Sequence, residues 1–247
     1  MTSLVQPARV LFDPLDATGA AVEAHRWVWP LLILVLCVSA SGTAFSLRWD
    51  ASPAVIQQLQ MEGELDRMTE TELSEKIQTA TRKALVGGIA KGVFVMPLLA
   101  LVLAAALWLL AWLFETPAPF ARLMSAAVLA LLPIALYHLI FAVCALAQHS
   151  LSLDRVPDLV PSSLAVLSGL TPKVKKVLGA VDFFNLWSVA LLALGFSSAT
   201  GMRRSRALLL FVVAYVLFTG VSLGLPELMA GDGGGPGGRP GPPGGGR

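Results

Sequence analysis

Charged side chains are scarce in this chain. Of its 247 residues, 14% are charged and 55% are hydrophobic, whereas about a quarter of the residues of a soluble domain are charged. The 18 basic and 16 acidic residues leave a net charge of +2, without the basic stripe that nucleic-acid binding requires. The composition therefore predicts an integral membrane protein and excludes nucleic acid as the expected partner.

Residues that could carry catalysis or bind a metal are equally few. The two cysteines, Cys37 and Cys144, both lie inside apolar runs, which excludes a disulfide framework and a cysteine zinc site. His138 lies midway along the same apolar run as Cys144, the third in the chain, and has no histidine or carboxylate three or four residues away. A histidine hydrogen-bonded between helices is favoured there over a proton relay. No phosphate-binding loop is present, so we expect no catalytic site, no cofactor and no metal.

What the chain does have is long apolar runs. Each run can cross about 30 Å of hydrocarbon, and in lipid only a helix satisfies its own backbone groups. The sequence thus predicts an all-α integral membrane protein, a five-transmembrane-helix bundle within a membrane domain of residues 27–225. The first run is too long for a signal peptide and is expected to remain as an anchor. The predicted spans are 27–47, 92–114, 123–147, 183–201 and 207–225.

Two terminal segments flank this domain. In residues 1–26, Leu15 and Val22 lie seven residues apart on one helical face. The segment is predicted to lie in the membrane interface with Trp27 and Trp29 as anchors, or to be an ordered lead-in without partners. Residues 226–247 are almost entirely glycine and proline without a triplet repeat, which predicts a disordered tail.

The connection 48–91 is expected to form two helices. Ser52 before Pro53 is a typical N-cap and first helical position, and Thr69 with Glu72 matches a capping box. The second helix continues into the second span and projects from the bilayer. It serves either as a docking surface for another protein or as half of a helical hairpin. The candidate partner-binding residues are Glu70, Glu72, Leu73, Glu75 and Ile77, and the hairpin would cover Leu73 and Ile77 with Val55, Ile56 and Leu59.

The connection 148–182 is expected to contain one more amphipathic helix. Thr171 and Pro172 begin it, and its apolar stripe leaves Lys173, Lys175 and Lys176 on other faces. These lysines are predicted to contact the headgroups of the lipid bilayer. At the end of the connection, Asp182 is expected to cap the fourth span.

Small residues and prolines predict how the spans pack. Gly88 and Gly92 lie four residues apart, as do Gly220 and Gly224, and this spacing lets helix backbones approach closely in lipid. Either pair would serve a homo-oligomer or, as we favour, the bundle itself. Pro97 and Pro133 are expected to kink the second and third spans.

The order of these elements resembles a known family. The quoted segments are Phe12-Asp13-Pro14, Trp29-Pro30, the stretch from Val181 to Trp187, Gly195-Phe196, and an arginine-rich link ending at Arg206-Ala207. Together they are similar to the bacterial branch of the Yip domain family, relatives of the Ypt/Rab-interacting membrane proteins, with Asp182, Trp187 and Gly195 as the family pattern. The resemblance implies a non-enzymatic membrane protein with a cytoplasmic N-terminus that acts through protein partners. Those partners are trafficking GTPases in eukaryotes.

The functional expectation combines both lines of reasoning. The chain is expected to be a scaffold or accessory subunit of a membrane protein complex, such as a transporter or the envelope or trafficking machinery, in the inner (plasma) membrane. Basic residues are more numerous in the connections on the side opposite the N-terminus, but the arginines packed between Met202 and Arg206 favour an N-terminus inside. The alternative function is a small permease or lipid-handling protein with a path past His138.

Overall fold

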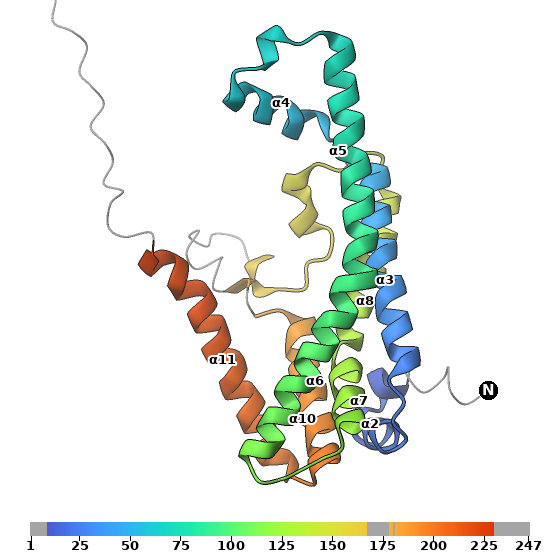
Figure 1. Ribbon diagram of the computed structural model, residues 1–247, viewed down its shortest axis with the longest axis vertical. Coiled ribbons are helices and arrows are strands. Elements are labelled where there is room, and N and C mark those ends of the chain that lie inside the picture. Colours follow the sequence, from blue (N-terminus) through green and yellow to red (C-terminus); the bar gives the residue numbers. More distant parts are fainter. Residues whose placement is uncertain (1–8, 167–177, 180, 230–247) are drawn as a thin grey trace, which may run out of the picture.

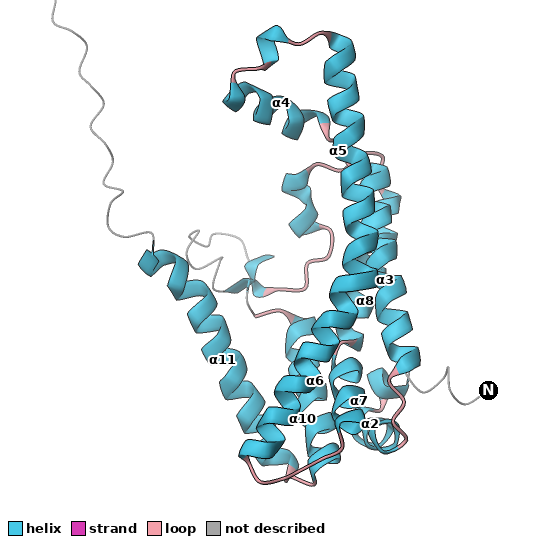
Figure 2. Cartoon of the chain, in the orientation of Figure 1, coloured by secondary structure: helices cyan, strands magenta, loops and turns pink. Residues whose placement is uncertain are grey.

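The computed structural model describes residues 9–166, 178–179 and 181–229, with the backbone alone for 166 and 223–229. Helices make up nearly all of this part of the chain, and it contains no strand beyond two isolated bridges (Figure 2). The predicted all-α fold is therefore confirmed. The elements are α2 (Pro14–Glu23), α3 (Val28–Arg48), α4 (Ser52–Glu62), η1 (Leu65–Arg67), α5 (Glu70–Ala90), the π-helical turn η2 (Lys91–Val95), α6 (Met96–Leu113), α7 (Phe120–Ala130), α8 (Leu132–Ala147), the 3-10 turns η3 (Leu153–Asp158) and η4 (Leu164–Val166), α10 (Phe183–Thr200) and α11 (Arg204–Met229).

Five helical stretches among the described residues are long and apolar enough to cross a membrane, as predicted. They are α3, the continuous run α5–η2–α6, the pair α7–α8, α10, and α11. Figure 1 shows that α2 and the links α6–α7 and α10–α11 lie at one end of the bundle, here called the lower end. The α4–α5 hairpin projects from the opposite, upper end.

Helix α7 forms the centre of the bundle. Every residue from Leu123 to Pro133 is buried, because α2, α6 and α10 all pack against α7. The one hydroxyl in this run, Ser125, donates to the carbonyl oxygen of Ala121 at 3.0 Å, so its burial leaves no polar group unpaired. By contrast α11 is the least buried of the five spans and packs mainly on α10.

Both intramembrane prolines coincide with interruptions of helical geometry. The chain makes a turn at Leu131, between α7 and α8 and two residues before Pro133. The π-helical turn η2 ends one residue before α6, in which Pro97 occupies the second position. Proline cannot donate a backbone hydrogen bond and crowds the preceding turn, so a break or a π-helical turn at these positions relieves both conflicts.

Glycines bring α3 and α5 into backbone contact. A Cβ added at Gly88 would lie 2.7 Å from the Cα of Gly42, and one added at Gly42 would lie 2.5 Å from the Cα of Gly88. A Cβ at Gly92 would collide with Ser39 and with the carbonyl oxygen of Val35. Gly88 and Gly92 thus lie within the bundle of one chain, the arrangement favoured above. Gly220 has no neighbour within 4 Å of its added Cβ.

Helix α2 belongs to the lower end of the bundle. It packs on α10 and α7 and buries Ala17, Thr18, Ala21 and Val22. The predicted apolar face is wrong in one respect, because Val22 is fully buried whereas Leu15 is 53% exposed. Contacts with α7 and α10, which the periodicity of an isolated segment does not reveal, select the buried face.

Candidate partner-binding site

The α4–α5 hairpin begins with a cap that differs from the predicted one. Helix α4 starts at Ser52, with Ala51 at the N-cap position and Pro53 within the first turn. The backbone N–H of Ser52 donates to Oδ1 of Asp50 at 3.0 Å. The helix therefore begins one residue earlier than predicted, and the predicted N-cap role of Ser52 is wrong because Ser52 is itself the first helical residue. Gly63, at φ +68°, ends the helix in the left-handed conformation that glycine adopts readily.

The start of α5 is the predicted capping box. The backbone N–H and the hydroxyl of Thr69 donate to Oε2 of Glu72 at 2.8 and 2.9 Å, and the backbone N–H of Glu72 donates to the Thr69 hydroxyl at 3.3 Å. The backbone hydrogen bond from Thr69, followed by the one from its side chain, lowers the pKa of Glu72 from its ordinary value of 4.5. The box fixes where the projecting helix begins.

A small apolar cluster holds the two helices together. On the α4 side, the buried residues are the N-cap Ala51 and the helical residues Val55 and Leu59. They pack with the half-buried side chains of Leu73 and Ile77 on α5. The hairpin interpretation is therefore confirmed for these residues. Ile56, which we had placed in the covering stripe, lies outside this cluster. The cluster also includes Ala80, which continues the apolar stripe of Leu73 and Ile77, and Met68, which the stripe did not single out.

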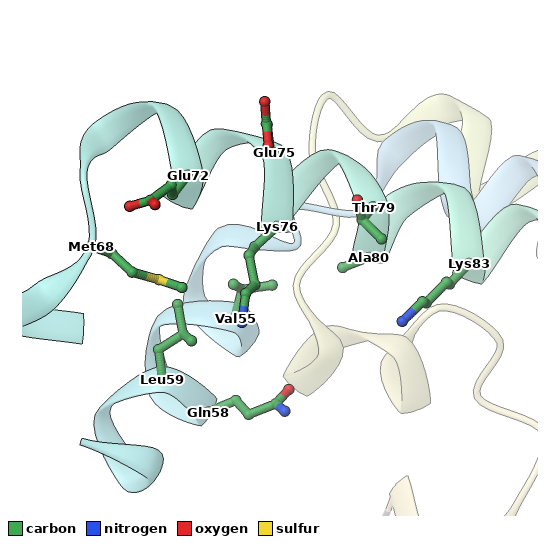
Figure 3. Close-up of a pocket in the computed structure, with 10 residues that line it drawn as sticks. All are labelled: Val55, Gln58, Leu59, Met68, Glu72, Glu75, Lys76, Thr79, Ala80 and Lys83. Carbon is green, nitrogen blue, oxygen red and sulfur yellow. The ribbon is translucent and has the colours of Figure 1, made fainter. Parts of the chain in front are cut away.

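An open groove lies between the helices beside this cluster (Figure 3). Its volume is about 630 Å³. Side chains of both charge signs surround apolar atoms in it, so the groove offers polar contacts around an apolar floor. The lining residues are Val55, Gln58, Leu59, Met68, Glu72, Glu75, Lys76, Thr79, Ala80 and Lys83. Lys76 also forms an exposed ion pair with Glu64, at 3.5 Å.

The structure divides the five predicted partner-binding residues into three groups. Leu73 and Ile77 face α4 within the hairpin cluster. Glu72 is engaged in the capping box. Glu70 and Glu75 are exposed, and neither belongs to an ion pair of the described residues. Of these last two, Glu75 lines the groove, so Glu70 and Glu75 remain the candidates for contact with a partner.

A second polar region lies inside the bundle around His138. The Ser41 hydroxyl donates to the carbonyl oxygen of Val38 at 2.9 Å, and its oxygen forms a hydrogen bond of 2.8 Å with Nδ1 of His138. This bond joins α3 to α8 and confirms the predicted histidine hydrogen-bonded between helices. Sequence reasoning missed Ser41, because it lies 97 residues from His138 and serine is common in membrane helices.

Two cavities meet at Tyr137 and His138. The first, of about 460 Å³, extends toward Ser41, Gly88 and Lys91. The second, of about 330 Å³, extends toward Ser162 and Asp182. Asp182 caps α10 as predicted, since its Oδ1 accepts from the backbone N–H of Asn185 at 3.0 Å. Its Oδ2 accepts a short hydrogen bond from the Ser162 hydroxyl.

The other two residues of the expected family pattern lie on α10. Trp187 is half-buried, and its ring lies 5.4 Å from that of Phe183, centroid to centroid. Gly195 faces α7, where an added Cβ would lie 2.8 Å from the Cβ of Ala126. Lys173, Lys175 and Lys176 lie outside the described residues, as does the tail from 230 onward. No group of three histidine, cysteine or carboxylate side chains that would hold a metal occurs in the described ranges.

The fold and its sites define a class of protein: a multi-pass α-helical membrane protein with a projecting helical hairpin. The chain matches the Yip1 domain over residues 8–225 and belongs to this family, as the resemblance indicated. The Yip1 family consists of non-enzymatic membrane proteins that interact with membrane partners. Comparison with curated proteins and with solved structures gives no significant match.

Proposed function

We propose that this protein is a non-enzymatic scaffold or accessory subunit that binds a membrane protein partner through the α4–α5 hairpin. The observation that carries the proposal is the groove at the projecting end of the molecule, which has charges of both signs around an apolar floor. The partner that fits is a neighbouring membrane protein with an extramembrane amphipathic segment, whose apolar side enters the groove. The proposed location is the inner (plasma) membrane, with the N-terminus in the cytoplasm.

Two physical features support a binding role for the hairpin. Its helices are held together by the apolar cluster, and the Thr69–Glu72 box fixes the start of α5, so little conformational entropy is lost on binding. Two methionines lie on the hairpin, exposed Met61 near the end of α4 and half-buried Met68 just before α5. Methionine side chains adapt to irregular apolar partners.

The test is affinity purification of the full chain in lipid nanodiscs, with identification and quantification of the membrane proteins recovered. The variant Glu70→Lys/Glu75→Lys reverses the two unengaged carboxylates and leaves the capping Glu72 intact. A second variant, Thr79→Trp, fills the groove from an exposed position. We expect both variants to lose a partner that the unaltered protein recovers in a fixed ratio.

The matched control reverses two exposed carboxylates at the same end of the bundle, in Asp154→Lys/Asp158→Lys on η3. It should recover the partner unchanged. If the control and the groove variants lose the partner equally, the effect is one of general charge and the groove is not the site. Full recovery by both groove variants would refute the hairpin as the binding surface.

The two cavities at His138 favour a second candidate function, that of a small permease. Both are lined by His138, one together with polar groups at the α5–η2 boundary and the other together with polar groups at the start of α10. We expect His138→Ala to abolish proton flux into reconstituted vesicles if this function operates, while His149→Ala, in the exposed loop after α8, leaves it intact. Flux that survives the His138 substitution would dispose of this candidate.

A further inference from the structure

A third cavity lies at the lower end of the bundle, where α6 ends and α11 begins. Its volume is about 670 Å³, and its lining comes from the end of α6, the link after α10, and the first turns of α11. Neither the proposed hairpin function nor the His138 region uses this cavity. One end of the cavity is lined by arginines near the α10–α11 link, and the other end is lined by apolar side chains of α11.

The link end of the cavity carries two arginines, Arg203 and Arg206, that form no ion pair within the described part of the chain. Arg203 immediately precedes α11 and Arg206 lies in its first turn, where the free backbone N–H groups and the helix dipole add positive potential. A guanidinium group can bind a phosphate group with two hydrogen bonds, so a phosphate is the anion that suits this end of the cavity.

The rest of the cavity is apolar and faces the bilayer. Leu209 and Val213 are 65% and 46% exposed on α11, and Phe114 closes the opposite side from the end of α6. Since α11 is the least buried span, these side chains are covered by lipid in a membrane. A soluble anion would contact only the arginines and would leave this apolar wall without a partner. An acyl chain lying along α11 would fill it.

We propose that this cavity binds one anionic phospholipid, with its phosphate on Arg203 and Arg206 and an acyl chain along Leu209 and Val213. The arginines lie beside the ends of three helices, α6 at Leu113, α10 at Thr200 and α11 at Arg204. The phosphate would therefore lie at headgroup level while the chain enters the hydrocarbon. The link is short and close to the span ends, as attraction to an anionic membrane surface requires.

The experiment is native mass spectrometry of the full chain released from nanodiscs that contain equal amounts of dioleoyl phosphatidylglycerol and dioleoyl phosphatidylcholine. We expect the unaltered protein to retain phosphatidylglycerol preferentially. Arg203→Ala/Arg206→Ala should reduce that retention about tenfold or more, because two charged contacts to one phosphate are lost. The control Arg204→Ala removes an arginine of the same link that does not line the cavity, and it should retain the lipid.

A second measurement protects the proposal against a variant that fails to fold. The increase in thermal stability on adding phosphatidylglycerol to detergent-purified protein should occur in the unaltered protein and in Arg204→Ala, and should be absent in Val213→Trp, which fills the apolar wall without altering charge. If Arg203→Ala/Arg206→Ala, Arg204→Ala and Val213→Trp all lost this stabilisation equally, the lipid would not be bound at this cavity in particular. That result would overturn the site. Displacement of the lipid by inorganic phosphate alone would show an ion site in its place.

Discussion

The two halves of α5 are stabilised in different ways. From Glu70 to Ala80 the helix stands in the hairpin, where Val55 and Leu59 cover one side and the capping box fixes its start. From Thr81 to Ala90 it belongs to the bundle, where Gly88 meets Gly42 backbone to backbone. In water the helix relies on apolar burial and capping, whereas in lipid, where burial brings little gain, it relies on close fit. One helix therefore has two different sensitivities to mutation.

The largest effect is expected where the fit is closest. Gly88→Leu places a side chain against backbone atoms of Gly42, which cannot rotate away, so we expect a loss of about 3 kcal/mol or more in stability. Thermal unfolding in detergent measures it. Gly87→Leu is the matched control, because nothing lies within 4 Å of an added Cβ there, and leucine is the better helix former. Equal destabilisation by both variants would contradict the backbone contact.

A smaller loss is expected in the hairpin cluster. Leu59 is only 2% exposed, and Leu59→Ala should cost about 2 kcal/mol, at the low end for a buried leucine because the hairpin can partly collapse. Hydrogen exchange should become faster in α4 and in the first half of α5, with α7 unchanged. Gln57→Ala, at an exposed position of the same helix, provides the control. Faster exchange throughout the bundle would show that the two regions are not independent.

Loss of the cap should have a weaker effect and remain local. Thr69→Ala removes the hydroxyl that accepts from the Glu72 backbone, at a cost of about 1 kcal/mol. Thr69→Ser retains the hydroxyl and is the matched control. Amide exchange in the first turn of α5 is the measurement, and no change there on losing the hydroxyl would refute its role.

The cap should also respond to acid. The pKa of Glu72 is lower in the folded hairpin than its ordinary value of 4.5 because Thr69 donates two hydrogen bonds to the carboxylate. Its contribution is therefore complete above the ordinary pKa and is lost as the pH falls through the lowered one. The amide resonances of Thr69 and Glu72 should shift together as the pH falls below 4.5, the ordinary pKa of Glu72, and through the lowered one. Glu72→Gln should remove this transition, and its persistence would assign it to another group.

The smallest effect is expected for the ion pair between Lys76 and Glu64. Both side chains are about half exposed and 3.5 Å apart, so Lys76→Met should change stability by about 0.3 kcal/mol or less. Methionine retains the aliphatic stem that lies over the cluster. Unfolding measured at low and high salt tests this prediction, and a loss comparable to that of Leu59→Ala would mean that charge contributes more to the hairpin than burial does.

The features predicted from sequence are those determined within a few residues. The five spans follow from apolar runs, and the Thr69 box follows from a three-residue spacing. The π-helical turn before Pro97 and the break before Pro133 follow from proline chemistry. The features that were missed depend on contacts distant in sequence. Gly42 opposite Gly88 and Ser41 beside His138 each join residues from different helices, and a single sequence contains no signal that pairs them.

The candidate sites divide in the same manner. The hairpin and its exposed acids were predicted because they are local, but the engagement of Glu72 in its own cap was visible only in the hydrogen bonds. The arginine link was noticed for its charge, whereas its cavity needs α6 and α11 side by side. The exposure of Leu15 follows from the way α2 meets α7 and α10, which no helical periodicity can specify.

The unbroken run from α5 through η2 into α6 also acts as a spacer (Figure 1). The 21 residues of α5 span about 32 Å at the rise of an α-helix. The groove lies on the first half of this helix and the second half packs in the bundle, so the helix, without a loop between groove and span, fixes the distance between a docked protein and the spans. Each residue inserted into α5 would move the groove about 1.5 Å farther from the spans and rotate it by about 100° around the helix axis. The distance of the groove from the membrane and the direction in which it faces therefore change together.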